Sequence, residues 1–311
     1  MSKKPVVCLS GGVGGAKLLL GLQSLCHDNL AAVVNTGDDF NHLGLRICPD
    51  IDTALYTLSG RSNTQLGWGR EGESWHCMEV LESLGAETWF KLGDKDLALH
   101  LERTRCLAEG ELLQDFTARV ARIWGIPAHI LPMSNQPVAT EVLTDAGYLP
   151  FQHYFVHQQC QPVCRGYRFV GAEEAEIAPA VIEVLQQPLQ AILIAPSNPY
   201  LSIAPILAVP GMQELIKNNG APVIAVSPLI GGRAVKGPTA KIMDELGVDV
   251  SAPAIAEFYR GLIDGFILDR EDECLQDQFN IPVAITDTLM KTEQDKQRVA
   301  EVALELARNL A

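Results

Sequence analysis

Positive charge is scarce in this chain of 311 residues: 24 Lys and Arg stand against 38 Asp and Glu, which gives a formal net charge of -14 at pH 7. A protein that binds duplex nucleic acid needs cationic cover for the phosphates, so this balance argues against a nucleic-acid partner. It argues equally against a polybasic membrane anchor. Apolar runs stop short of the roughly 18 residues of a membrane span, and the first residues lack the features of an export signal. We therefore expect no membrane association.

Paired cysteines are also missing from the sequence. The eight cysteines are scattered, and none forms a C-x-x-C pair. In a chain without an export signal this pattern predicts buried, reduced thiols and hence a cytoplasmic protein. Aromatic residues make up only 6% of the chain, whereas 47% of it is hydrophobic. We therefore expect a sizeable core built mainly from Ala, Val, Leu and Ile, which is not the composition of a disordered chain.

Short apolar runs alternate with amphipathic stretches along most of the sequence, which is typical of a parallel sheet wrapped by helices. Continuous apolar runs of this length suit strands that are covered on both faces. The expected strands are 5–9, 31–35, 190–195, 221–226, 265–268 and 282–285, and the expected helices are 17–26, 177–186, 212–217, 240–246 and 291–310.

The segment from about residue 60 to residue 125 has a different pattern, with helical stretches separated by loops rich in glycine and charge. We expect a helical excursion from the sheet there. Residues 138–157 alternate as a β-strand does and predict antiparallel strands at the sheet edge. The predicted fold is one α/β domain over residues 1–311: a Rossmann-like, mostly parallel sheet covered by helices (about 1–59 and 126–311) with the helical excursion (about 60–125).

A glycine-rich loop follows the first expected strand and opens the first helix; residues 10–17 read SGGVGGAK. Glycines let the backbone approach a ligand there, and a helix N-terminus presents N–H groups to an anion. The P-loop pattern fails because Lys17 is followed by leucine, and the dinucleotide pattern fails because Lys17 replaces its third glycine. A tight turn without a ligand is the alternative, but four glycines in five positions exceed what a turn needs. An anionic, nucleotide-like ligand of a non-standard kind is favoured.

Carboxylates gather after the second expected strand. Asp38 and Asp39 come three and four residues after Asn35, and Asp50 and Asp52 come soon after. Carboxylates bind hard cations, and Mg²⁺ prefers one or two of them together with water and phosphate oxygens. Helix capping could explain one of Asp50 and Asp52, but it does not account for all four carboxylates. A metal ion that bridges these carboxylates to an anionic substrate is the favoured interpretation.

Further short motifs continue in order along nearly the whole chain. They lie at residues 68–69, 92–96 with His100 and Arg103, 131–134, 151–152, 196–199 with 202–203 and 205–207, 226–228 and 236–238. Together with residues 11–19, 35–39 and 47–53, they resemble the 2-phospho-L-lactate transferase family, which acts in the biosynthesis of the deazaflavin coenzyme F-420.

The resemblance implies a Mg²⁺-dependent transferase. A guanosine diphosphate ester of a three-carbon acid (lactate, enolpyruvate or glycerate) would donate its phospho-acid portion. The acceptor would be the terminal ribityl hydroxyl of 7,8-didemethyl-8-hydroxy-5-deazariboflavin, and GMP would leave. Such transfer depends mostly on positioning and charge neutralisation. A related family with the same glycine-rich opening gives the alternative, a non-catalytic regulatory protein that binds a nucleotide sugar.

The resemblance also implies roles for individual residues. Asp38 and Asp50 are predicted to coordinate the metal, with Asp39 as a further ligand. Asp38, Asp50 and Asp52 are predicted to be catalytic, with one of Asp39 and Asp52 orienting the attacking hydroxyl as a base. The predicted substrate-binding residues are Gly11, Gly12, Gly14, Gly15, Lys17, Asn35, Thr36, Asp94, His100, Arg103, Ser197, Asn198 and Ser202.

The chain departs from the family at Lys95, where arginine is usual. Lysine keeps the charge but loses the bidentate fork, so Arg103 is a candidate for the remaining fork. An NAD-dependent oxidoreductase is disfavoured, because the second strand does not end in the lone acidic residue that binds a ribose hydroxyl. A homodimer is expected only because two-fold dimers are common.

Overall fold

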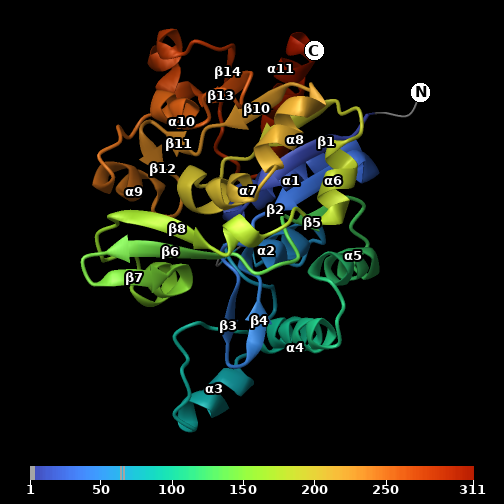
Figure 1. Cartoon of the computed structure of the whole chain (residues 1–311), viewed down its shortest axis with the longest axis vertical. Coiled ribbons are helices and arrows are strands. Elements are labelled where there is room, and N and C mark those ends of the chain that lie inside the picture. Colours follow the sequence, from blue (N-terminus) through green and yellow to red (C-terminus); the bar gives the residue numbers. More distant parts are fainter. Residues whose placement is uncertain (1–3, 64, 66) are drawn as a thin grey trace.

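The computed structural model describes residues 4–63, 65 and 67–311. Residues 1–3, at the start of the chain where we expect no export signal, and residues 64 and 66, within the expected excursion, lie outside the described residues. In the described part, seven strands form one parallel sheet in the order β14-β13-β10-β9-β1-β2-β5 (Figure 1). They are β1 (Val6–Ser10), β2 (Leu30–Val34), β5 (His129–Pro132), β9 (Ala191–Ile194), β10 (Val223–Val226), β13 (Gly265–Asp269) and β14 (Val283–Thr286).

Helices cover both faces of this sheet, which confirms the predicted α/β fold. Val6 and Cys8 of β1 pack into one core layer, and Val7 and Leu9 pack into the other. Both sets are fully buried, as expected for an apolar run in a central parallel strand. The first layer is formed by α1 (Gly12–Cys26), α2 (Pro49–Leu58), α5 (Leu113–Ile123) and α11 (Glu293–Leu310), and the second by α6 (Pro179–Leu185), α7 (Ala204–Ala208), α8 (Met212–Asn219), α9 (Thr239–Glu245) and α10 (Ala252–Phe258).

The strand order reverses between β1 and β9. From β1 the chain runs outward through β2 to β5, and it then returns to β9 and runs outward the other way through β10, β13 and β14. At such a reversal the loops that leave the two central strands diverge, and ligands bind in the crevice at their carboxyl ends. The glycine-rich loop follows β1 and residues 195–198 follow β9, so both border this crevice.

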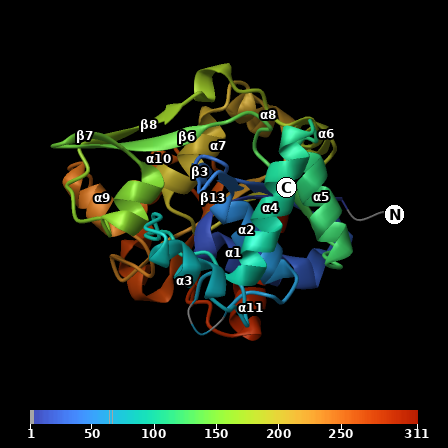
Figure 2. The same ribbon diagram turned by 90° about the horizontal axis from the view of Figure 1, so that it is seen from below.

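An extension that we call the arm projects below the sheet (Figure 1), and Figure 2 looks onto it from that side. The arm comprises the hairpin β3 (Phe40–His42) and β4 (Leu45–Ile47), α3 (His76–Ser83) and α4 (Asp94–Ala108). It has a small core of its own, made by Ile47, Met78, Leu92 and Leu97. The excursion expected over residues 60–125 thus differs from the arm in its bounds. It leaves out the hairpin, which comes earlier in the chain. It also includes α5, whose Phe116 packs with the main sheet.

A second, antiparallel sheet in the order β7-β6-β8 stands beside the main one. It contains β6 (Ala139–Thr144), β7 (Gly147–Pro150) and β8 (Gly166–Val170). The antiparallel pairing expected for residues 138–157 is confirmed, but its placement at the edge of the main sheet is wrong, because β5 is that edge. Residues 153–157 are also helical, with Tyr154 fully buried in the core. Burial of that ring, rather than strand alternation, explains their apolar pattern.

Short elements complete the described part of the chain. They are β11 (Leu229–Ile230) and β12 (Arg233–Ala234), the 3-10 turns η1 (His27–Asn29), η3 (Ala172–Glu174) and η5 (Arg270–Gln278), and the π-helical turns η2 (His153–His157) and η4 (Pro199–Ile203). None of the described helices is both long enough and apolar enough to cross a membrane.

Candidate active site at the carboxyl edge of the sheet

The glycine-rich loop is held against the loop after β9. The backbone N–H of Gly11 donates to Ser197 Oγ at 3.1 Å, and that hydroxyl donates to the Gly11 carbonyl at 2.7 Å. A Cβ on Gly11 would lie only 2.7 Å from both Asp50 Oδ2 and Ser202 Cβ. The structure thus brings four predicted site residues together, and glycine is required at position 11 because no space is left for a side chain.

The other glycines of the loop also serve close packing. A Cβ on Gly14 would lie 2.6 Å from the Pro196 carbonyl oxygen, and one on Gly15 would meet the hydroxyls of Ser10 and Ser197. Gly12 has open space around it but a φ of +64°, which L side chains rarely adopt. Its N–H donates to Asp50 Oδ1 at 2.7 Å. The N-terminus of α1 therefore faces a carboxylate of this chain directly.

Asp38 and Asp50 share one amide partner. Asn35 Nδ2 donates to Asp38 Oδ1 at 3.1 Å and to Asp50 Oδ2 at 3.0 Å, while Asn35 Oδ1 accepts from the Gly37 N–H at 2.7 Å. Asp38 and Asp50 are 7% and 6% exposed, so two like charges are held close together away from water. Such a pair disfavours full ionisation unless a cation joins it.

The pKa values of the pair are raised for this reason. Burial, and next to it the negative charge of Asp50, raises the pKa of Asp38 well above its usual range, although the Asn35 amide opposes the rise. Burial likewise raises the pKa of Asp50 to about 6, against the hydrogen bonds from Asn35 and from the Gly12 N–H. A divalent cation between them would favour the ionised form of both carboxyls and so oppose both shifts.

The other two predicted carboxylates have arginine partners. Arg46 Nη2 contacts Asp39 Oδ2 at 3.3 Å, and burial still raises the pKa of Asp39 to about 7 despite that arginine. Arg103 binds Asp52 with both Nη atoms; Nη1 donates to Asp52 Oδ2 at 3.1 Å. The four carboxylates expected to form one acidic cluster thus fall into two kinds. Asp39 and Asp52 each form an ion pair with an arginine, whereas Asp38 and Asp50 share only the neutral Asn35 amide.

The donor set at Asp38 and Asp50 fits a hard divalent cation. Within the described ranges, no group of three His, Cys, Asp or Glu side chains has the geometry of a metal site. A site of two carboxylates suits Mg²⁺, which keeps several waters and takes its remaining ligands from substrate phosphates. The buried Thr36 Oγ1 and Asp39 Oδ1 also lack a hydrogen-bond partner. Asp38 and Asp50 are therefore the residues that would hold the ion.

Several predicted substrate-binding residues have partners within the protein. Asp94 lies on the arm, where it accepts from the Ser74 hydroxyl at 2.6 Å and from the N–H groups of His76 and Cys77, and so fixes the start of α3. Asn198 Oδ1 accepts the N–H groups that open η4. Lys95, which replaces the family's arginine, donates to the Gly72 carbonyl at 2.5 Å.

Lys17, by contrast, has an environment suited to an anion. The side chain is half-buried on α1, one turn beyond the glycines of the loop. Burial, and next to it the positive charge of Lys236, lowers the pKa of Lys17, with a further contribution from Lys296. An anionic ligand between these ammonium groups would relieve their repulsion.

Four residues that complete the site were given no site role from the sequence, although two of them, Gln152 and Asp96, lie in the motifs of the resemblance. Arg46 pairs with Asp39 as described, and Gln152 Nε2 donates to the Asp38 carbonyl at 3.3 Å. Asp96 contacts His100 Nε2 at 3.2 Å and accepts from the Tyr56 hydroxyl. The last two carried a usable signal: Asp96 lies four residues before His100, and Tyr56 four residues after Asp52, which places each pair on one helix face.

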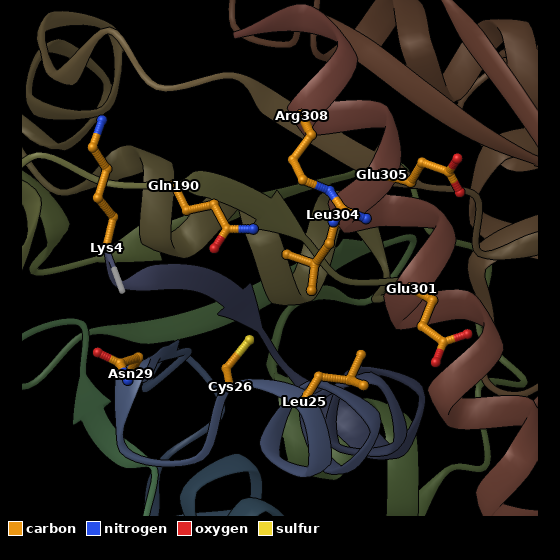
Figure 3. A pocket seen from close by; sticks show the side chains of 9 residues that line it. All are labelled: Lys4, Leu25, Cys26, Asn29, Gln190, Glu301, Leu304, Glu305 and Arg308. Carbon is orange, nitrogen blue, oxygen red and sulfur yellow. The ribbon is translucent and has the colours of Figure 1, made fainter. Parts of the chain in front are cut away.

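The described surface is hollowed at two places that differ in their relation to the carboxylates of the site. One, of about 770 Å³, lies at the amino ends of the strands, on the side opposite the carboxylates (Figure 3). The other, of about 580 Å³, borders the site through Arg46 and extends between the arm and the loop after β5, with Asn41, Asn135 and Gln136 in its wall. The cavity beside Arg46 is the one positioned to receive part of a substrate.

Comparison with known proteins gives consistent matches over nearly the whole chain. The family model described as 2-phospho-L-lactate transferase CofD matches residues 6–308. The 2-phospho-L-lactate transferase of Methanosarcina mazei is 38% identical over 304 residues, which cover 96% of this chain and 99% of that protein. The phosphoenolpyruvate transferase of Streptomyces coelicolor is 39% identical over 274 residues, 86% of each chain.

A solved structure supports the fold alone. The crystal structure of a upf0052-family protein from Bacillus halodurans superposes with a TM-score of 0.63 and covers 98% of this chain and 99% of its own. Its sequence identity is 18%, so only the architecture is shared by this criterion. The parallel sheet and its covering helices are thus found in a solved protein.

Proposed function

The chain belongs to the 2-phospho-L-lactate transferase CofD family and is a transferase, and we propose that it catalyses a Mg²⁺-dependent step of coenzyme F-420 biosynthesis. In this step a phospho-hydroxyacid, such as 2-phospholactate or phosphoenolpyruvate, passes from its guanosine diphosphate ester to the ribityl hydroxyl of 7,8-didemethyl-8-hydroxy-5-deazariboflavin. A P–O bond forms between that hydroxyl oxygen and the phosphorus that carries the acid. The bond from this phosphorus to the GMP oxygen breaks, GMP leaves, and the hydroxyl releases its proton to the leaving phosphate or to water.

The observation that carries the proposal is the buried pair of Asp38 and Asp50 at the reversal of strand order. Both carboxylates bind the same Asn35 amide, and Asp50 also binds the first N–H of α1. A bound Mg²⁺ would supply charge neutralisation for the phosphate oxygens that gain charge during transfer. The residues of this chain would hold the ion and orient the diphosphate against the N-terminus of α1.

Three further predicted residues lie around this pair. Lys17 on α1 would contact the phosphates from the helix side, since its own pKa is already lowered by burial and neighbouring ammonium groups. Ser197 and Ser202 hold or border the glycine-rich loop. The cavity beside Arg46 would take part of one substrate.

The proposal is tested by turnover. The protein is incubated with the deazaflavin acceptor, Mg²⁺ and, in parallel, the guanylated esters of lactate, enolpyruvate and glycerate, and GMP and the phosphorylated deazaflavin are measured by chromatography. We expect equal amounts of the two products with at least one donor, and no turnover after Mg²⁺ is chelated. Asp50→Asn should abolish turnover while circular dichroism shows an intact fold.

One result would contradict the proposed transferase activity. If no donor yields GMP although the protein binds a guanylated ligand in calorimetry, the transferase proposal is wrong, and the regulatory nucleotide-sugar-binding alternative takes its place. Light scattering of the same sample tests the proposed homodimer, and a cytoplasmic location is tested by fractionation of the source cells. Neither outcome affects the chemical proposal.

A further inference from the structure

Side chains of helix α4, which belongs to the arm, form hydrogen bonds with the segment that carries Asp50. Arg103 Nη1 donates to Asp52 Oδ2 at 3.1 Å and to the Arg46 carbonyl at 3.3 Å, and Arg103 Nη2 binds the other oxygen of Asp52. Asp52 is two residues after Asp50, and Arg46 is four residues before it. A single guanidinium therefore bonds to the chain on both sides of the carboxylate proposed to hold the ion.

Two further hydrogen bonds join α4 to the same segment. Thr104 Oγ1 accepts the Arg46 N–H at 2.8 Å, so neighbouring residues of α4 bind both the N–H and the C=O of residue 46. One turn further along α2, the Tyr56 hydroxyl donates to Asp96, near the start of α4. The face of α2 that carries Asp52 and Tyr56 is thus joined to α4 at two points.

The position of Arg103 separates it from a substrate ligand. The whole residue has no exposed surface, and its guanidinium carbon lies 5.5 Å from the ring of Phe116 in the core. A buried ion pair adds little net stability, because desolvation offsets the attraction between the charges. What a bidentate pair does provide is geometry: two parallel N–H···O bonds fix the orientation of the carboxylate. Arg103 therefore has the features of a residue that sets the position of α2.

We propose that Arg103 is a positioning residue, which holds the first turn of α2 so that Asp50 and Asp38 meet at the distance needed to share one divalent cation. The inference rests on the proposed function, because it deepens the role of the same site. Asp50 is already fixed at one end by the Gly12 N–H and the Asn35 amide. Arg103 fixes the backbone that carries it, so the arm determines the geometry of the ion site.

The test uses Arg103→Lys, which keeps the charge and removes the fork, beside Arg105→Lys as a matched control. Arg105 lies on the same helix, half-exposed and paired with Glu102 and Glu109. Three properties are measured on the full chain: Mg²⁺ affinity by calorimetry without substrates, hydrogen–deuterium exchange of residues 49–58, and kcat and KM. The first two readouts do not depend on turnover.

We expect Arg103→Lys to weaken Mg²⁺ binding by about tenfold and to speed exchange in α2. The value of kcat should fall by roughly a hundredfold, the loss typical of a displacement of about 1 Å at a reacting centre. The KM for both substrates should stay within about twofold, since Arg103 does not touch them. Arg105→Lys should leave all three properties unchanged.

Other outcomes would overturn the inference. A lower melting temperature with unchanged Mg²⁺ affinity and kcat means that the ion pair is only structural, and a raised donor KM with unchanged exchange in α2 means that Arg103 binds the donor. If Arg103→Lys does not fold, Thr104→Val decides, because it keeps Arg103 and removes only the Thr104 hydroxyl, which accepts the Arg46 N–H and donates to the His100 carbonyl within α4; it should change the same readouts in the same direction by less. If the wild type releases no GMP, the proposed function fails, but Mg²⁺ affinity and exchange still test the positioning role.

Discussion

The metal-free protein should lose stability as the pH rises from about 4 to about 6. Burial raises the pKa of Asp50 from 3.8 to about 6. Below pH 4 the carboxyl is protonated in the folded and the unfolded chain, so it contributes no difference. Between pH 4 and 6 the unfolded chain releases this proton while the folded protein keeps it, which favours unfolding. Above pH 6 the contribution of Asp50 is complete and stays constant.

The size of this loss follows from the two pKa values. A rise from 3.8 to about 6, at about 1.4 kcal/mol for each pH unit, corresponds to about 3 kcal/mol. The neighbouring Asp38, whose pKa is also raised by burial and by the charge of Asp50, adds a contribution of the same sign. For a protein with a free energy of unfolding in the usual range of about 5–15 kcal/mol, this is a large fraction.

Urea unfolding followed by circular dichroism, repeated from pH 4.5 to pH 7.5 in the presence of a chelator, measures the effect. Asp50→Asn removes the titrating group and, with it, the charge that raises the pKa of Asp38, so the difference between wild type and variant measures the contribution of this pair while the carboxyls away from it cancel. We expect the wild type to lose about 2 kcal/mol relative to the variant over this range. Mg²⁺ at about 100 times its Kd should return about 2.7 kcal/mol to the wild type at pH 7 and none to the variant.

A flat difference curve would refute the reasoning. It would mean that the Asp50 carboxyl titrates normally in the folded protein, and hence that water or a cation of this chain reaches the Asp38–Asp50 pair. A constant offset between the two proteins would not matter, because the amide of the variant faces the Asn35 amide and costs a hydrogen bond at every pH. The prediction is tested by how the difference in free energy of unfolding changes with pH, and not by its value at any single pH.

Three further variants test the geometry around the site. Gly11→Ala places a Cβ 2.7 Å from an Asp50 carboxylate oxygen; we expect about 1–3 kcal/mol of lost stability and a kcat at least tenfold lower, whereas Gly166→Ala, with its nearest neighbour at 3.9 Å, should change neither. Thr292→Ala removes the capping box of α11 and should cost about 1 kcal/mol in urea unfolding with kcat unchanged. Asp94→Ala should speed proteolysis at the start of α3 without changing substrate KM; a higher KM would instead support its predicted substrate contact.

The sheet could be predicted well because its strands are buried on both faces. The run from Val6 to Leu9 must be apolar at every position, and this signal is local. The edge strand β5 was not predicted, because it is short and begins with the exposed His129. The hairpin β3–β4 was missed for a different reason. It turns at Leu43 and Gly44, both with positive φ, in a segment for which no strand is expected from the sequence.

The residue types at the candidate site could be read from the sequence, but their pairing could not. Asp38, Asp39, Asp50 and Asp52 look equivalent along the chain, and only the fold decides which of them meets an arginine. Arg103 reaches Asp52 because α4 packs beside α2, a contact between segments 51 residues apart. Arg46 has no local signal at all, since its role depends on the hairpin that places it beside Asp39.

The contact between Gly11 and Ser197 joins positions 186 residues apart, and it has a consequence for how the protein matures. All four carboxylates leave the ribosome within the first fifth of the chain, but the hydroxyl that fixes the glycine-rich loop emerges only after β9 has been made. For most of its synthesis, a nascent chain therefore contains the acidic residues but lacks the contact between Gly11 and Ser197. The glycine-rich loop thus gains this contact in one late step, when β9 docks beside β1 and brings Ser197 to Gly11.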